Sequence, residues 1–216
     1  QSLCGCLIRM VMAIPSVEIW RKQGLHQEGL LAVSIHPDGD RFATSGQDGC
    51  VLIWDSNQGD LMHSIQPGKA WVEHLAWSAD GDHLAVAASK TVHIYTGDGE
   101  ERWRTEEHPS TVSAIAWSRP DELATASYGQ VCFHDITRQQ VGQKLQWQGS
   151  LISMVLSPGG DIVACGSQDN SVHFWRRSTG LDAEMTGYPG KPSQLAFDQS
   201  GRFLATGGSD PIIVWN

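Results

Sequence analysis

The feature that most constrains this chain is an internal repeat with a period of about 40 residues. Five segments each contain three runs of alternating apolar and polar residues, separated by a polar turn and then a shorter turn. The third run of each segment ends in an aromatic or imidazole side chain, at Trp54, Tyr95, His134, Trp175 and Trp215. These positions lie 41, 39, 41 and 40 residues apart, a drift that is typical of tandem units whose loops vary in length.

Each unit has the pattern of antiparallel strands joined by tight turns. Period-two alternation of Val, Ile, Leu and aromatic residues, bounded by Gly, Pro and Asp, indicates such strands. One unit shows it over residues 31–35, 42–45 and 51–54, and its linker adds a fourth run at 61–65. A sheet of four short strands cannot bury both of its faces alone, whereas radially stacked sheets can. The sequence therefore predicts an all-β fold, a β-propeller of four-stranded antiparallel blades.

The units resemble WD repeats. The dipeptide Trp54-Asp55 closes one of them, and Leu25-His26 followed by Pro37-Asp38-Gly39 is similar to the Gly-His opening and Pro-Asp-Gly turn of that family. The closing position is held elsewhere by Trp20, Trp175 and Trp215. The resemblance covers nearly the whole chain and implies a protein-interaction scaffold that displays loops on a rigid ring.

The resemblance also implies a hydrogen-bonded tetrad that fastens each blade, made of an opening His, a strand Ser or Thr, a turn Asp and the closing Trp. One unit matches at all four places, with His26, Thr44, Asp48 and Trp54. The other units are incomplete, since Cys165 replaces the hydroxyl in one and Gly129 replaces the Asp in another. We expect the tetrad to be structural and not catalytic, although it contains His, Thr and Asp.

The repeats divide the chain into one propeller domain over residues 1–216. We expect a partial blade at 1–24, with strands at 7–13 and 16–20, and repeats at 25–66, 67–106, 107–146, 147–187 and 188–216, the last incomplete. Rings of the family that the chain resembles usually close with about six or seven blades. The chain is therefore expected to be a fragment of a larger propeller, completed by flanking sequence or by a partner chain.

Charge and cysteine usage limit the partners and the compartment. Fifteen basic and 24 acidic residues give a net charge of −9, which repels phosphate backbones and argues against nucleic acid as the partner. The apolar run from Leu7 to Pro15 is interrupted by Arg9 and predicts neither a membrane helix nor a signal peptide. Five scattered cysteines are typical of a reducing compartment. We predict an intracellular, cytoplasmic protein, with the nucleus or an organelle left open.

Motifs for chemistry do not survive inspection of their spacing. Gly207-Gly208-Ser209 lacks the Lys and the following helix of a phosphate loop, and Cys4 and Cys6 lack the second ligand pair of a zinc site. We therefore predict no metal, no cofactor and no catalytic residue. Two alternatives to a binding scaffold stay open: a regulatory or sensory part of a larger enzyme, and a propeller hydrolase or small-ligand binder that uses the central channel.

The candidate site is the rim on which loops converge. Trp and Tyr combine apolar area with a polar group and are common binding anchors, so Trp71 and then Tyr128 are the leading candidates. The alternative for each aromatic residue is local packing against the adjacent blade. The full set of predicted contact residues is Trp71, Tyr128, Lys69, Lys90, Lys191, Gln47, Gln168, Trp147 and Tyr188.

Overall fold

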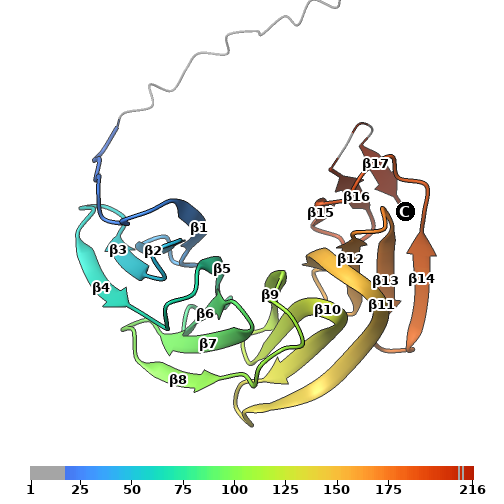
Figure 1. Cartoon of the computed structure of the whole chain (residues 1–216), viewed down its shortest axis with the longest axis horizontal. Coiled ribbons are helices and arrows are strands. Elements are labelled where there is room, and N and C mark those ends of the chain that lie inside the picture. The colour runs from blue at the N-terminus through green and yellow to red at the C-terminus, as the bar shows by residue number, and fades with distance from the viewer. Residues whose placement is uncertain (1–17, 209, 211) are drawn as a thin grey trace, which may run out of the picture.

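A computed structural model describes residues 18–216, except 209 and 211. Within these residues it has 17 strands and no helix. The strands form antiparallel sheets that stand side by side around an open arc (Figure 1). The predicted all-β propeller architecture is therefore confirmed. Among the described residues, no helix is long and apolar enough to span a lipid bilayer.

The first two sheets each contain four strands in sequence order. One sheet comprises β1 (Leu30–Ile35), β2 (Arg41–Gly46), β3 (Val51–Asp55) and β4 (Leu61–Ile65). The next comprises β5 (Val72–Trp77), β6 (His83–Ala88), β7 (Thr91–Thr96) and β8 (Glu101–Arg104). Each of these two sheets thus corresponds to one sequence repeat.

The third sheet has six strands and contains two consecutive repeats. Its strands are β9 (Ala114–Arg119), β10 (Glu122–Asp135), β11 (Gln140–Leu156), β12 (Ile162–Ser167), β13 (Val172–Arg176) and β14 (Leu181–Met185). Strand β10 covers two predicted runs and turns at Gly129, whose φ is 77°. Strand β11 continues from the outermost run of one repeat into the first run of the next, so no loop separates these two repeats.

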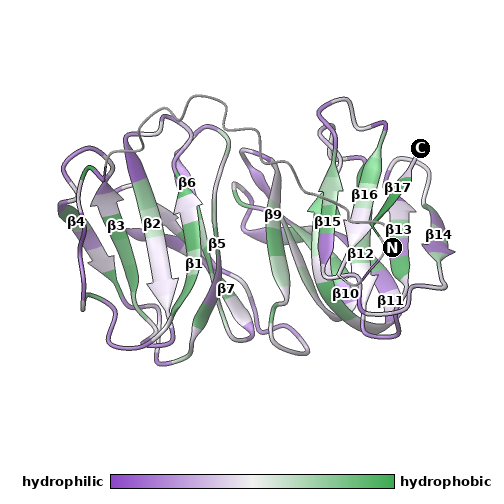
Figure 2. Ribbon diagram, turned by 90° about the horizontal axis from the view of Figure 1, so that it is seen from above, coloured by the Kyte–Doolittle hydropathy of each residue, from purple (hydrophilic) through white to green (hydrophobic). Residues whose placement is uncertain are grey.

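The last sheet contains β15 (Gln194–Phe197), β16 (Leu204–Gly207) and β17 (Ile213–Trp215). Inner strands contact one another along the arc, in the order β1, β5, β9, β11 and β15. Apolar side chains fill the space between sheets, as where Ile53 of the first sheet packs with Val72 and Val86 of the second. Figure 2 shows hydrophobic residues concentrated in the strands and hydrophilic residues in the turns at both rims.

The N-terminal segment packs against the first sheet. Residues 18–29 contain no strand, and the Trp20 ring stacks on Phe42 with a centroid distance of 5.7 Å. The Trp20 indole N–H also donates to the Ser56 carbonyl at 3.0 Å. The predicted strand at 7–13, most of the predicted strand at 16–20, and Cys4 and Cys6 lie outside the described residues.

Candidate partner-binding face

One rim of the arc carries the predicted contact residues. It is the rim at which the first and third strands of each sheet begin and the second and fourth end, because the strands are antiparallel. We call it the anchor face. It comprises the loops 66–71, 105–113 and 186–193 and the turns 46–50, 88–90, 127–130 and 167–171.

Trp71 and Tyr128 are the two large aromatic side chains that this face exposes most, at 50% and 58% of their surface. The loop before Trp71 is pressed against the turn of the preceding sheet, since a side chain at Gly49 would come within 3.0 Å of the Ala70 carbonyl. Tyr128 is held by its backbone N–H, which donates to Ser110 Oγ at 2.8 Å. The backbone at Trp71 is thus held by the preceding repeat, and the backbone at Tyr128 is held by a loop of its own repeat.

The polar candidates differ in how free they are to contact a partner. Lys69, Lys90 and Lys191 are exposed on the anchor face. Gln168 is exposed as well, and its backbone N–H donates to the Ser150 carbonyl at 3.0 Å. Gln47 is half-buried, and its side-chain Oε1 accepts a hydrogen bond from the Gly29 N–H at 3.2 Å.

Trp147 and Tyr188 lie in packing positions. Tyr188 is only 7% exposed, and its hydroxyl lies 2.7 Å from Thr206 Oγ1 and accepts from the Trp215 indole N–H at 3.1 Å. Trp147 is half-buried and stacks on His173 with ring centroids 3.8 Å apart. These surroundings favour the packing alternative for both side chains.

The predicted tetrad residues are hydrogen-bonded to one another. His26 donates from Nδ1 to the Asp48 carboxylate at 3.1 Å, and its Nε2 lies 2.9 Å from Thr44 Oγ1. The Trp54 indole N–H donates to the same hydroxyl oxygen at 2.9 Å. Burial would raise the pKa of Asp48, but hydrogen bonds from the Cys50 N–H, His26 and the Gln27 N–H outweigh it and lower that pKa. Thr44 is thus the buried centre of a partly buried hydrogen-bond network.

Two other repeats keep the hydroxyl hub with different partners. Thr206 joins Tyr188 and Trp215, so a phenol replaces the imidazole. Thr125 joins His108, at 2.8 Å, and His134, at 3.0 Å. The backbone carbonyl of Lys90, in the preceding repeat, takes the place of the missing Asp by accepting from His108 Nδ1 at 3.0 Å. Comparison of the repeats places Tyr188 at the position of the opening His, but it does not indicate that the Lys90 carbonyl replaces the Asp.

The described residues contain no group of three or more His, Cys, Asp or Glu side chains placed to hold a metal ion. Cys50, Cys132 and Cys165 are free thiols. Burial raises the pKa of Cys165 well above its ordinary value, so this thiol is un-ionised and belongs to the core.

Comparison with known proteins agrees with this geometry. The family model described as "WD domain, G-beta repeat" matches residues 21–55, 59–96 and 141–176, which together make up half of the chain. The chain belongs to the WD-repeat family. Proteins of this family generally serve as protein-interaction scaffolds.

Several curated WD-repeat proteins are similar to it along most of its length. Pre-mRNA-processing factor 19 of Oryza sativa subsp. japonica is 28% identical over 204 residues, which cover 88% of this chain. Autophagy-related protein 16 of Arabidopsis thaliana is 22% identical over 87% of the chain, and Small ribosomal subunit protein RACK1 of Schizosaccharomyces pombe is 26% identical over 70%. The chain spans only 38% of the length of each of these relatives.

Proposed function

We propose that this WD-repeat chain is a non-catalytic, intracellular scaffold that binds a protein or peptide partner on its anchor face. The observation that carries the proposal is the exposure of Trp71 and Tyr128 on one rim of adjacent repeats, while Trp54, Trp77 and Trp175 are almost fully buried. An aromatic side chain on a fixed backbone contributes contact area at little cost in conformational entropy.

Charge supports the choice of this face. Lys69 lies two residues before Trp71 in the same loop, and Lys90 lies in a turn that is hydrogen-bonded to the loop 105–113. The anchor face also carries the carboxylates Asp48, Glu106, Glu107 and Asp169, but the turns on the opposite rim are more acidic and include Asp38, Asp80 and Asp98. A partner that presents apolar and acidic side chains together therefore fits the anchor face better than the opposite rim.

The test is partner capture from native lysate with quantitative mass spectrometry. The wild-type chain is compared with the double variant Trp71→Ala/Tyr128→Ala and with Leu61→Ala/Leu181→Ala. The control pair removes comparable exposed apolar area, 47% and 68% exposed, from outer strands away from the anchor face. Circular dichroism and thermal melting establish that all three proteins fold.

We expect partners that the wild type and the control pair capture equally to fall at least about tenfold in the anchor variant, the loss typical of removing two binding anchors. Equal capture by all three folded proteins would assign recognition to another surface. Loss in the control pair alone would assign it to the outer strands.

A further inference from the structure

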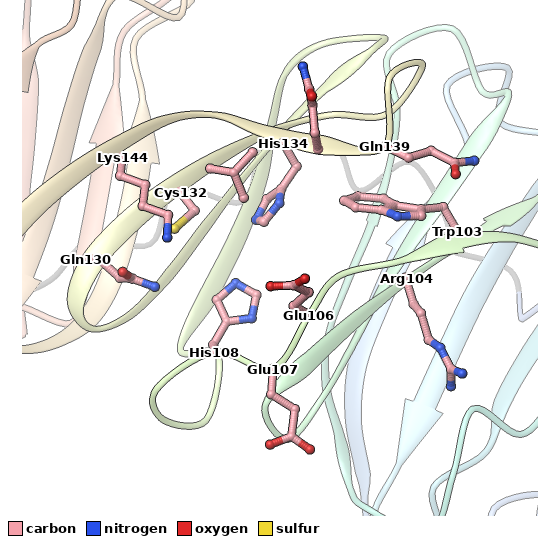
Figure 3. Close-up of a pocket in the computed structure, with 12 residues that line it drawn as sticks. Trp103, Arg104, Glu106, Glu107, His108, Gln130, Cys132, His134, Gln139 and Lys144 are labelled. Carbon is pink, nitrogen blue, oxygen red and sulfur yellow. The ribbon is translucent and has the colours of Figure 1, made fainter.

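A second site is a pocket of about 350 Å³ between β8 of the second sheet and the six-stranded sheet, and it shares the loop 105–113 with the anchor face. Trp103, Glu106 and His108 line it from the second sheet and the following loop, and His134 and Lys144 line it from β10 and β11. In Figure 3 the imidazoles of His108 and His134 face a shared space, with Trp103 on one side and Lys144 with Cys132 on the other.

His134, which lines the pocket, occupies the closing position of its repeat, where the first sheet has Trp54. In the first sheet the Trp54 indole N–H donates to Thr44, and at the equivalent place His134 Nε2 lies 3.0 Å from Thr125 Oγ1. When the two five-membered rings are matched through these nitrogens, the Nδ1–Cε1 bond of His134 falls where the indole carries its six-membered ring. The shorter side chain lacks that ring, and Nδ1 stands where the indole carries one of the two atoms shared by its rings.

The hydrogen bonds fix which ring nitrogens carry protons. His108 Nδ1 contacts a carbonyl oxygen, so it must carry the proton, and neutral His108 accepts at Nε2. The Thr125 hydroxyl then donates to His108, and its oxygen accepts from His134 Nε2–H. His134 Nδ1 is left with a lone pair. It is buried and has no hydrogen-bond partner within the described part of the chain.

The imidazole of His134 is neutral at physiological pH. Burial, followed by the charges of His108 and Lys144, lowers its pKa from 6.5 to about 4. The positive charge of Lys144 also contributes to lowering the pKa of His108, and it opposes the rise that burial causes in the pKa of Cys132. Lys144 therefore lies near both side chains at this end of the pocket. Lys144 makes no ion pair with any residue that the structure describes.

These groups define the chemistry of a ligand. The acceptor at His134 Nδ1 requires an N–H or O–H donor, and Lys144 Nζ offers donors to a carbonyl oxygen. The planar rings of His134 and Trp103 both line the pocket, and such rings pack well against a planar group. The charged lining residues Arg104, Lys144, Glu106 and Glu107 balance in sign, so they favour no net charge.

We propose that this pocket binds a neutral planar carboxamide, whose N–H donates to His134 Nδ1 and whose carbonyl accepts from Lys144. The inference does not depend on the proposed partner-binding face. Access to the buried nitrogen requires lining side chains to move, and the lining includes the exposed side chains of Gln139 and Gln140.

The probes are benzamide, benzoate and benzylamine, which share one ring and differ in charge and in hydrogen-bonding groups. Each is titrated into the whole chain labelled with ¹⁵N at histidine, and the ring-nitrogen resonances are followed by NMR. Three variants accompany the wild type: His134→Trp, Lys144→Met and, as a matched control for removal of an exposed lysine, Lys191→Met. His134→Trp keeps an N–H for Thr125, as Trp54 does for Thr44, removes the Nδ1 acceptor and places a six-membered ring on that side of the pocket.

We expect unliganded His134 to show a protonated Nε2 and an unprotonated Nδ1, and benzamide to shift the Nδ1 resonance selectively. Binding should weaken about tenfold in Lys144→Met, as expected for the loss of one hydrogen bond to a charged group, and should remain unchanged in Lys191→Met. In His134→Trp it should be abolished.

Three results would overturn the proposal. Benzoate or benzylamine binding as tightly as benzamide would show that one charge governs the pocket. Absence of a His134 Nδ1 shift at millimolar benzamide would show that the nitrogen receives no donor. Unchanged benzamide affinity in folded His134→Trp would place the ligand elsewhere, and if that variant does not fold, the Lys144→Met comparison and the wild-type spectrum decide.

Discussion

Glu122 and Arg177, 55 residues apart in the sequence, form a two-pronged ion pair within the six-stranded sheet. Arg177 Nη1 lies 2.9 Å from Glu122 Oε2, and Nη2 lies 3.1 Å from Oε1. The guanidinium also stands 3.5 Å above the centre of the Phe133 ring. Both charged side chains are largely shielded from solvent, with 18% of the Arg177 side chain and 13% of the Glu122 side chain exposed. This pair ties two consecutive repeats together.

We expect Arg177→Lys to lower the free energy of unfolding by about 1–2 kcal/mol, although charge is retained. Lysine cannot form two parallel hydrogen bonds or stack its charge flat on Phe133. Urea unfolding measures the change. The control is Arg138→Lys, because Arg138 is paired with Asp135 but its side chain is 74% exposed. This substitution should change the free energy of unfolding by no more than about 0.5 kcal/mol. Equal effects would show that the geometry of the buried pair contributes nothing.

The same pair predicts a dependence of stability on pH. Burial would raise the pKa of Glu122, but hydrogen bonds from Arg177 and Ser118 outweigh it and hold that pKa below 4.5. A carboxyl whose pKa is lower in the folded state stabilises above its unfolded pKa, and that contribution is lost as the pH falls through the folded value. The stability difference between wild type and Glu122→Gln should therefore shrink between about pH 6 and about pH 3.

Urea unfolding at several pH values in that range measures this difference. Glu107→Gln, an exposed change, corrects for the general effect of removing one negative charge. A difference that stays constant across the range would contradict the assigned ion pair.

Thr125 is expected to be more sensitive to loss of its hydroxyl than to loss of its methyl group. Thr125→Val leaves buried nitrogens of His108 and His134 without their shared partner, and should cost about 2–3 kcal/mol of unfolding free energy. Thr125→Ser retains the hydroxyl and should cost less than about half of that. Thermal melting of the two variants gives the comparison, and equal losses would mean that the hydroxyl is not the hub.

Gly166 should not tolerate any side chain. A Cβ atom there would lie 1.8 Å from the Pro192 carbonyl oxygen, on the loop that leads into the last sheet. Gly166→Ala must push this backbone away and should cost at least about 2 kcal/mol. At Gly159 nothing lies within 4 Å of a Cβ, and Gly159→Ala should be neutral within about 0.5 kcal/mol. Similar urea midpoints for the two variants would contradict the close contact.

The repeat pattern was sufficient to predict the strands and the all-β architecture, because each strand depends on local alternation and turn residues. It also located the tetrad of His26, Thr44, Asp48 and Trp54, whose hydrogen bonds the structure shows. It did not predict that β11 joins two repeats into one six-stranded sheet. The substitute for the missing Asp could not be predicted, since the Lys90 carbonyl reaches Thr125 only through His108 of the next repeat, and a backbone group leaves no trace in side-chain identity.

Other features depend on contacts between distant residues. Trp20 holds the expected place of a closing tryptophan, yet it stacks on Phe42, because the Trp20 position in space depends on packing and not on its place in a pattern. Similarly, nothing in the sequence around Glu122 indicates Arg177 as its partner. For the candidate site, the pattern could assign residues to a rim, but only burial separates exposed Trp71 from buried Tyr188.

Strand β11 has a mechanical consequence. Loops 66–71, 105–113 and 186–193 are the joints between the other consecutive repeats, whereas β11 passes from one repeat into the next as a single strand. We therefore expect the middle of the arc to resist bending, since bending it would break hydrogen bonds that β11 makes with β10 and with β12. Changes in the curvature of the arc should therefore occur at the three loops and not within β11.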